Sequence, residues 1–178
     1  MKILALDLGR HTGWCRLDTG ALAPARAAGN YTSPEITYGT QDNGGDDAVL
    51  FDRVMAFDDW IWHELFEFDP DCIAFEASGY GRRGHALAAF WSYYGVILTA
   101  GRASMKGSSR FESVNASTLK KWATGSGRAG KELMIHEATT RLQPIAPPSA
   151  LPAHDEADAI LLALYVKEKL TTAALVGR

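Results

Sequence analysis

The sequence is poor in cysteine and lacks any long apolar run. Its 178 residues include only Cys15 and Cys72, which provide neither a disulfide framework nor a CxxC metal motif. Both lie in apolar, strand-like contexts that favour buried, reduced thiols. No stretch reaches the roughly 18 apolar residues that cross a bilayer, and Asp7 interrupts the amino terminus where a signal peptide would stay apolar. The sequence therefore predicts a soluble, cytoplasmic protein without membrane association.

An excess of positive charge is also missing, since the formal net charge is −3. Residues 35–76 nevertheless hold twelve acids against Arg53 alone, whereas residues 80–131 hold nine bases against Glu112 alone. Such segregation is typical of a basic face for a polyanion and an acidic face turned away from it. Two solvated surfaces without a partner would give the same pattern. The average charge therefore does not exclude a nucleic-acid ligand.

Residues 1–178 fit a single α/β domain, with 47% apolar and 22% charged residues. The pattern of apolar residues and turn signals predicts strands at 2–7, 12–17, within 27–38, at 71–76 and at 111–115. Helices are expected at 46–68, 85–103, from Ser117, at 131–142 and at 154–170. Basic, glycine-rich loops separate these elements at 78–84 and 124–130. This order indicates a mixed β-sheet flanked by α-helices.

Four acids lie at positions where a site could form. Asp7 and Glu76 each end an apolar strand, and ligand sites gather at the carboxyl ends of strands in α/β sheets. Asp155 and Asp158 are three residues apart at a helix start and share one face. If that helix packs beside the first strand, all four converge. The alternative is that Asp155 and Asp158 merely cap their helix.

Clustered carboxylates repel one another, so convergence implies a divalent cation. Oxygen ligands suit Mg²⁺, with Mn²⁺ as a possible substitute, and do not suit zinc. Two such ions per active site would serve in-line phosphodiester hydrolysis, one activating water and the other stabilising the leaving oxygen. The acids therefore point to a metal-dependent nuclease.

Three motifs together resemble those of the RuvC-type Holliday junction resolvases. They are Ile3-Leu-Ala-Leu-Asp7-Leu-Gly9 with Thr12-Gly13, then Ile73-Ala-Phe-Glu76, then His154-Asp-Glu-Ala-Asp158. The resemblance follows the family's motif order over nearly the whole chain. It implies a ribonuclease H-like fold, with Asp7, Glu76, Asp155 and Asp158 as the catalytic, metal-binding acids. It also implies a homodimer that nicks two strands of a four-way junction or other branched DNA.

The same resemblance, together with the basic loops, gives candidate DNA contacts. Lys120, Lys121 and Lys131 match the family's lysine- and glycine-containing segment, and the loops add Tyr80, Arg82, Arg83 and Arg128. Tyr80 lies about where cellular resolvases carry an aromatic wedge. His154 is expected to cap the helix or to support the acids from a second shell. The glycines and arginines around Tyr80 and the long acidic segment 21–46 favour a divergent phage- or prophage-like branch.

Two other functions fit part of this pattern. A ribonuclease H-fold nuclease could act on structured RNA instead of DNA. The series Asp7-Leu-Gly9 with Thr12-Gly13 also resembles the first phosphate motif of actin-like nucleotide-binding proteins. Those proteins need two such domains, for which 178 residues leave no room. The basic glycine loops favour branched DNA.

Overall fold

The computed structural model describes residues 1–20, 35–45, 47–77, 84–104, 110–145 and 151–176. Two predictions lie outside these ranges: the start of the third strand between residues 27 and 34, and the loop that carries Tyr80, Arg82 and Arg83. Within the described ranges, none of the helices is long and apolar enough to cross a membrane.

Five strands form one mixed sheet in the order β3–β2–β1–β4–β5. The strands are β1 (Lys2–Asp7), β2 (His11–Asp18), β3 (Glu35–Asp42), β4 (Cys72–Ala77) and β5 (Arg110–Asn115). β2 pairs antiparallel with β1 and with β3, whereas β4 pairs parallel with β1 and with β5. The predicted mixed sheet is confirmed. Strand β3 overlaps the predicted range and ends at Asp42 rather than at Tyr38, because this polar edge strand is defined by its pairing with β2 and not by an apolar run of its own.

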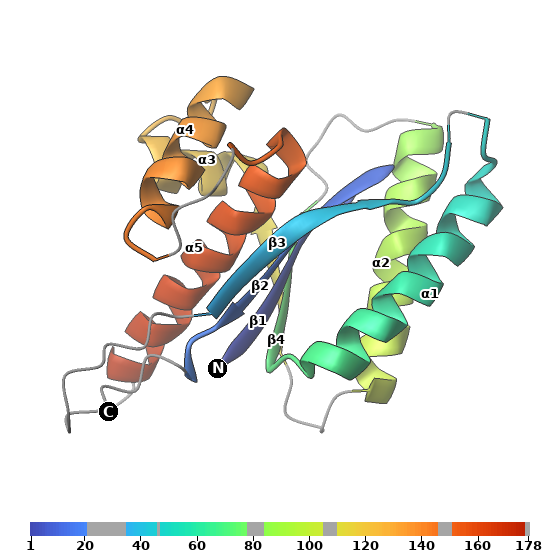
Figure 1. The fold of residues 1–178 in the computed structure, drawn as a ribbon, viewed down its shortest axis with the longest axis horizontal. Coiled ribbons are helices and arrows are strands. Elements are labelled where there is room, and N and C mark those ends of the chain that lie inside the picture. The colour runs from blue at the N-terminus through green and yellow to red at the C-terminus, as the bar shows by residue number, and fades with distance from the viewer. Residues whose placement is uncertain (21–34, 46, 78–83, 105–109, 146–150, 177–178) are drawn as a thin grey trace.

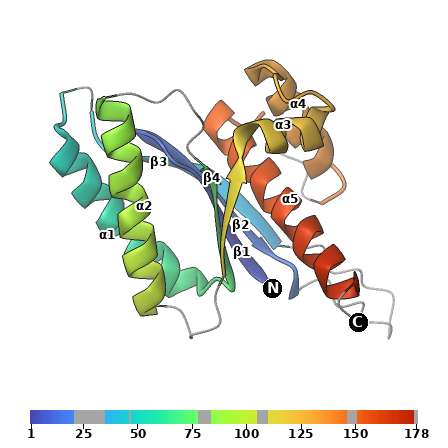
Figure 2. The same ribbon diagram turned by 180° about the vertical axis from the view of Figure 1, so that it is seen from behind.

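Helices cover both faces of this sheet (Figure 1). On one face lie α1 (Leu50–Phe68) and α2 (His85–Ser104), which pack against each other. On the other face lies α5 (His154–Val176), with α3 (Ala116–Thr124) and α4 (Lys131–Leu142) packed on it, as the reverse view shows (Figure 2). The predicted flanking of the sheet by α-helices is therefore confirmed.

Alternate residues of each strand enter two separate cores. Ile3 and Ala5 of β1 pack in the core with α5, whereas Leu4 and Leu6 pack in the core with α1 and α2. This alternation follows from the two-residue period of a strand. Cys15 and Cys72 are free and buried on the α5 side, and burial raises the pKa of the Cys72 thiol to about 12. The prediction of buried thiols is confirmed.

Helix α1 buries the face that its apolar spacing predicts, with Phe57, Ile61 and Leu65 in the core. It begins at Leu50 and not at 46, because the chain first makes a turn in which Ala48 N–H donates to Gly45 O (3.1 Å). It ends at Asp69, whose φ of 46° is left-handed and whose N–H donates to Leu65 O. The proline that follows prevents the helix from continuing.

Two further helix ends differ from the sequence prediction. Helix α3 begins at Ala116 and not at Ser117, because its cap is Asn115, whose side chain accepts the Ser117 N–H at 2.9 Å. Helix α5 extends to Val176 and not only to Leu170, although its last residues are exposed. Exposed helix ends give no apolar period from which a limit could be read.

Candidate functional site

Asp7 and Glu76 occupy neighbouring positions at the carboxyl ends of two parallel strands. Leu6 of β1 pairs with Phe75 of β4, so the next residue on each strand is an acid. Asp7 lies on the same face of β1 as Ile3 and Ala5, and Glu76 lies on the same face of β4 as Cys72 and Ala74. Both carboxylates are therefore directed to the α5 face of the sheet. Both side chains are half-buried.

The first turn of α5 lies directly over this edge of the sheet. Asp7 pairs with Gly13 of β2, and a Cβ at Gly13 would overlap the carbonyl group of Asp155. Only a residue without a side chain allows so close an approach. Gly13 thus seats the start of α5 beside Asp7, which is the packing that convergence of the four acids requires.

Glu156 makes the capping bond at this helix start. Its carboxylate accepts the backbone N–H of Ala153 at 2.8 Å, three residues upstream, in the reciprocal half of a capping box. The same side chain accepts the Thr40 hydroxyl of β3 at 3.2 Å. The sequence analysis did not single out Glu156, although an acid at this spacing is the signal for such a cap. Asp155 and Asp158 contact His154 instead.

His154 lies between those two acids. Its Nδ1 is 3.1 Å from Asp155 Oδ1, and its Nε2 is 3.3 Å from Asp158 Oδ2. A ring contacting both carboxylates holds them in fixed orientations, as second-shell partners do for ligating groups. The structure therefore places His154 in contact with both acids, and its supporting role stays a prediction.

Asp158 is the most deeply buried of the four candidate acids, with 6% of its surface exposed. Its Oδ1 is buried and accepts no hydrogen bond from any described residue. Burial raises the pKa of this carboxyl group, and the charge of Asp155 adds to the increase. The positive charges of His154, Lys120 and Lys131 act in the opposite direction. An ionised Asp158 is therefore costly unless a cation joins it.

Lys120 and Lys131 bring positive charge to the acids from α3 and α4. Lys120 is half-buried, whereas Lys131 begins α4 and is exposed. Lys121 and Arg128 are also exposed, on α3 and on the turn before α4. Lys121 lines a surface hollow of about 640 Å³ together with Ser117 and Gly127. Tyr80, Arg82 and Arg83 lie outside the described residues.

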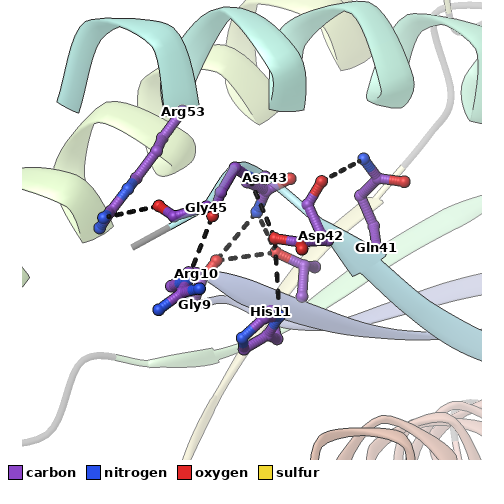
Figure 3. Close-up of polar contacts among 10 residues, drawn as sticks. Gly9, Arg10, His11, Gln41, Asp42, Asn43, Gly45 and Arg53 are labelled. Carbon is purple, nitrogen blue, oxygen red and sulfur yellow. Dashed lines mark hydrogen bonds and ion pairs between the residues drawn. The ribbon is translucent and has the colours of Figure 1, made fainter. Parts of the chain in front are cut away.

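A buried polar network holds the turn that follows Asp7. Asn43 Nδ2 donates to Gly9 O and to Thr12 Oγ1, each at 2.9 Å, and Thr12 Oγ1 donates to Gly9 O at 3.1 Å (Figure 3). Asn43 and Thr12 are both fully buried. The sequence analysis missed Asn43, because no local pattern reveals a partner 31 residues from Thr12. Thr12 and Gly13 thus serve packing here, which argues against the phosphate-motif interpretation of these residues.

In the described ranges, no group of three or more His, Cys, Asp and Glu side chains has the arrangement that would hold a metal ion. The donor chemistry nevertheless fits a hard cation. The groups at this edge are carboxylate oxygens, and Asp158 Oδ1 is a buried oxygen that lacks a partner within the described structure.

Comparison with solved structures identifies proteins with a similar fold. Thermus thermophilus RuvC matches with a TM-score of 0.68 and 18% identity, over 95% of this chain and 97% of that chain. T. thermophilus RuvC in complex with a Holliday junction substrate matches with a TM-score of 0.69 and 16% identity, over 94% of this chain and 96% of that chain. Fowlpox virus resolvase with its Holliday junction DNA matches with a TM-score of 0.58 and 12% identity, over 96% of this chain and 99% of that chain. No protein-family model and no curated protein matches the chain in sequence, so the phage-like branch stays a prediction. The chain has the ribonuclease H-like fold of the Holliday junction resolvases.

Proposed function

We propose that this chain is a metal-dependent endonuclease that resolves Holliday junctions or other branched DNA by paired phosphodiester hydrolysis. The observation that carries the proposal is the single edge at which Asp7, Glu76 and the first turn of α5 meet, with Gly13 permitting the contact. The three solved structures described above are RuvC or a viral resolvase, and two of them hold Holliday junction DNA. The domain spans residues 1–178.

Asp7, Glu76, Asp155 and Asp158 would hold two Mg²⁺ ions, or Mn²⁺ in their place. When bound, the ions supply an activated water and stabilise the leaving oxygen. The chain itself prepares the acids for this role. His154 orients Asp155 and Asp158 through its two ring nitrogens, and the Asn43 network holds the turn that begins after Asp7.

The lysines and arginines would hold the DNA strand against the acids. Lys120 and Lys131 lie close enough for their charges to lower the Asp158 pKa against the effect of burial, so a scissile phosphate at the acids would also meet them. Lys121 and Arg128 extend this positive surface along α3 and the following turn, and Tyr80, Arg82 and Arg83 would add the contacts of their loop. Contacts to phosphates make affinity strongly dependent on salt.

A homodimer would match the two-fold symmetry of a four-way junction. Both helices of the α1–α2 layer carry exposed apolar side chains suited to self-association. Phe51, Met55, Trp62 and Phe66 follow one face of α1, and Leu87 and Trp91 lie one turn apart on α2. Exposed apolar surface of this kind marks interaction sites. We assign this dimer patch to contact with a second copy.

The test compares the wild-type protein with Asp7→Asn on labelled four-way junction, linear duplex and structured RNA, each with Mg²⁺ and with chelator. We expect symmetric cuts in the junction that require Mg²⁺. Asp7→Asn should lower the cleavage rate by at least about 10³-fold, because an amide binds a divalent cation poorly. The variant should still bind the junction.

Asp59→Asn, which removes an exposed acid of α1, is the matched control and should cleave normally. Cleavage by Asp7→Asn at the wild-type rate would contradict the site. Preferential cleavage of RNA would show that the substrate is structured RNA, and the assignment of the acids would stand.

A further inference from the structure

A second candidate site lies on the other face of the sheet, between the turn after β1 and the first turns of α1 and α2. It is a cavity of about 530 Å³, a volume in the usual range for small-molecule pockets. Arg10, Arg53, His85, Phe90 and Tyr93 are among the residues that line it. None of these is an acid of the candidate nuclease site. We call it the arginine cavity.

Two arginines from distant parts of the chain bring positive charge to the arginine cavity. Arg10 Nε donates to Gly44 O at 3.1 Å, and Arg53 Nη2 donates to Gly45 O at 3.3 Å. Figure 3 shows Arg10 reaching from the strand turn and Arg53 from α1 toward the same segment. Each guanidinium is thus anchored to backbone next to the cavity. Guanidinium groups are well suited to phosphate oxygens, since they offer several donors in one plane.

Two helix N-termini add to this positive field. α1 and α2 both begin at the end of the sheet where β1 ends, as Figure 1 shows, and the cavity is lined by Val49 and Leu50 of α1 and by His85 and Ala86 of α2. Val49, the N-cap of α1, gives no side-chain hydrogen bond to the helix. Val49 therefore leaves the first N–H groups of α1 without a bond from the N-cap side chain, and such groups attract anions.

Tyr93 supplies an independent sign that the arginine cavity takes a polar ligand. Its side chain is 1% exposed, and among the described residues its hydroxyl makes no hydrogen bond of good geometry. Burial raises the pKa of Tyr93, while the charge of Arg53 and the Asn43 side chain, which lies close enough to act as a weak hydrogen-bond partner, oppose the increase. The phenol is therefore neutral and can donate. A buried hydroxyl with so weak a partner gains from a ligand that accepts its hydrogen bond.

We propose that the arginine cavity binds one nucleotide through its phosphate. Arg10, Arg53 and the first turn of α1 hold the phosphate oxygens, Tyr93 donates a hydrogen bond, and the apolar wall that includes Phe90 receives sugar and base. We assign this nucleotide to a branched DNA strand, and this assignment rests on the proposed nuclease function. Phosphate binding by the cavity does not.

The first experiment observes the ring resonances of His85 by nuclear magnetic resonance in chelator, where no cleavage can occur. The probes are inorganic phosphate, thymidine 5′-monophosphate and thymidine. The two phosphate-bearing probes should shift His85 in a saturable way, and thymidine should not. His63, on the exposed side of α1, serves as an internal reference. No saturable shift, or an equal shift with thymidine, would overturn the proposal.

Arg53→Gln and, separately, Tyr93→Phe should weaken thymidine monophosphate binding by about tenfold or more, as expected for loss of a hydrogen bond to a charged ligand. Arg102→Gln, near the far end of α2, is the matched control and should bind normally. Arg10→Gln is a second variant in case Arg53→Gln unfolds, which denaturant titration would reveal. Unchanged binding by folded variants of both arginines would overturn the assignment.

Junction binding at several salt concentrations distinguishes the sources of the nucleotide. If the cavity holds a strand phosphate, Arg53→Gln should flatten the dependence of log affinity on log salt by about one unit. An unchanged slope together with weaker mononucleotide binding would overturn the strand assignment in favour of a free nucleotide. Nucleotide binding in a protein that never cleaves DNA would sink the nuclease proposal alone.

Discussion

At the scale of single residues, the close approach of Asp155 to Gly13 makes a direct prediction. Gly13→Ala would place a methyl group on the Asp155 carbonyl and force the first turn of α5 away from β2. Overpacking of this kind typically costs about 1–3 kcal/mol. We expect the free energy of unfolding to fall by that amount in a urea titration, and junction cleavage to fall at least tenfold, since two of the four acids would move.

Gly95→Ala provides the control for this substitution. Gly95 lies within α2, and no atom lies within 4 Å of the place its Cβ would take. Alanine there should stabilise the helix by up to about 1 kcal/mol, because it loses less backbone entropy than glycine. If Gly13→Ala were as stable and as active as Gly95→Ala, the seating of α5 by Gly13 would be wrong.

The burial of Asp158 should lower the stability of the metal-free protein, although the carboxylate is needed for activity. Burial raises its pKa in the folded protein, so the folded state binds the proton more tightly than the unfolded chain. The metal-free protein should therefore lose stability as pH rises from the ordinary carboxyl pKa through the raised value of Asp158. Asp158→Asn removes this loss and should stabilise the metal-free protein at pH 7, by roughly 0.5–2 kcal/mol.

Thermal or urea unfolding in chelator across pH 3 to 8 measures this effect. The gain from Asp158→Asn should be largest at neutral pH and shrink toward zero below the unfolded-state pKa of about 3.9. The variant should also cleave junctions far more slowly, because a ligand is lost. A variant that is less stable than wild type at pH 7 would show that the interactions of Asp158 with His154 and the lysines outweigh its burial.

At the scale of elements, the end of β3 holds the turn that follows β1 through Asn43. Asn43→Ala would remove both bonds of the side-chain amide and leave Gly9 O and Thr12 Oγ1 with fewer partners in a buried place. Loss of buried hydrogen bonds of this kind costs about 1–3 kcal/mol. We expect that loss in the free energy of unfolding, together with faster amide hydrogen exchange in the turn at residues 9–12.

Thr37→Ala is the matched control on the same strand. Thr37 is exposed, and a surface substitution usually changes stability by less than about 0.5 kcal/mol. Hydrogen exchange in the turn should then match wild type. Equal exchange rates in the Asn43 and Thr37 variants would show that the network does not hold the turn.

These elements also show what sequence alone can predict. The periodic positions of α1 and the apolar run of β1 are local signals, so the sequence predicts that these two elements exist. The end of β3 and the role of Asn43 depend on partners far along the chain, and no local period encodes them. Asp7 and Glu76 could be singled out because each ends an apolar strand, whereas their adjacency needed the β1–β4 register. Prediction failed where long-range pairing replaced local preference.

At the scale of the whole molecule, the sheet lies between the acidic helix α1 and the basic segment of α3. Helix α1 lies on one face, and α3, which carries Lys120 and Lys121, lies beyond the other (Figure 1). This arrangement fits the segregated faces expected from the sequence. Arg10 and Arg53 depart from it, because they bring positive charge to the α1 side at the end where both helices begin. A DNA strand crossing that end of the sheet could meet both positive surfaces.

The dimer patch on α1 and α2 gives a prediction for the assembled protein. Trp91 is 55% exposed and Phe66 85% exposed, more than large apolar side chains usually are. Replacing a Trp at the centre of an interface commonly costs more than 2 kcal/mol of binding. Trp91→Glu should therefore raise the dimer dissociation constant by about 30-fold or more, measured by analytical ultracentrifugation over a concentration series.

The consequence for cleavage follows from the two-fold substrate. A dimer cuts both strands while it stays on one junction, whereas a monomer must bind twice, so Trp91→Glu should accumulate singly nicked junctions. Phe66→Glu tests the same patch on α1, away from the ring contacts that Trp91 makes with Phe90 and Tyr94. Val176→Glu, at the exposed end of α5, is the control and should leave the dimer intact. If both patch variants dimerise and cut pairwise like the control, the second copy binds elsewhere.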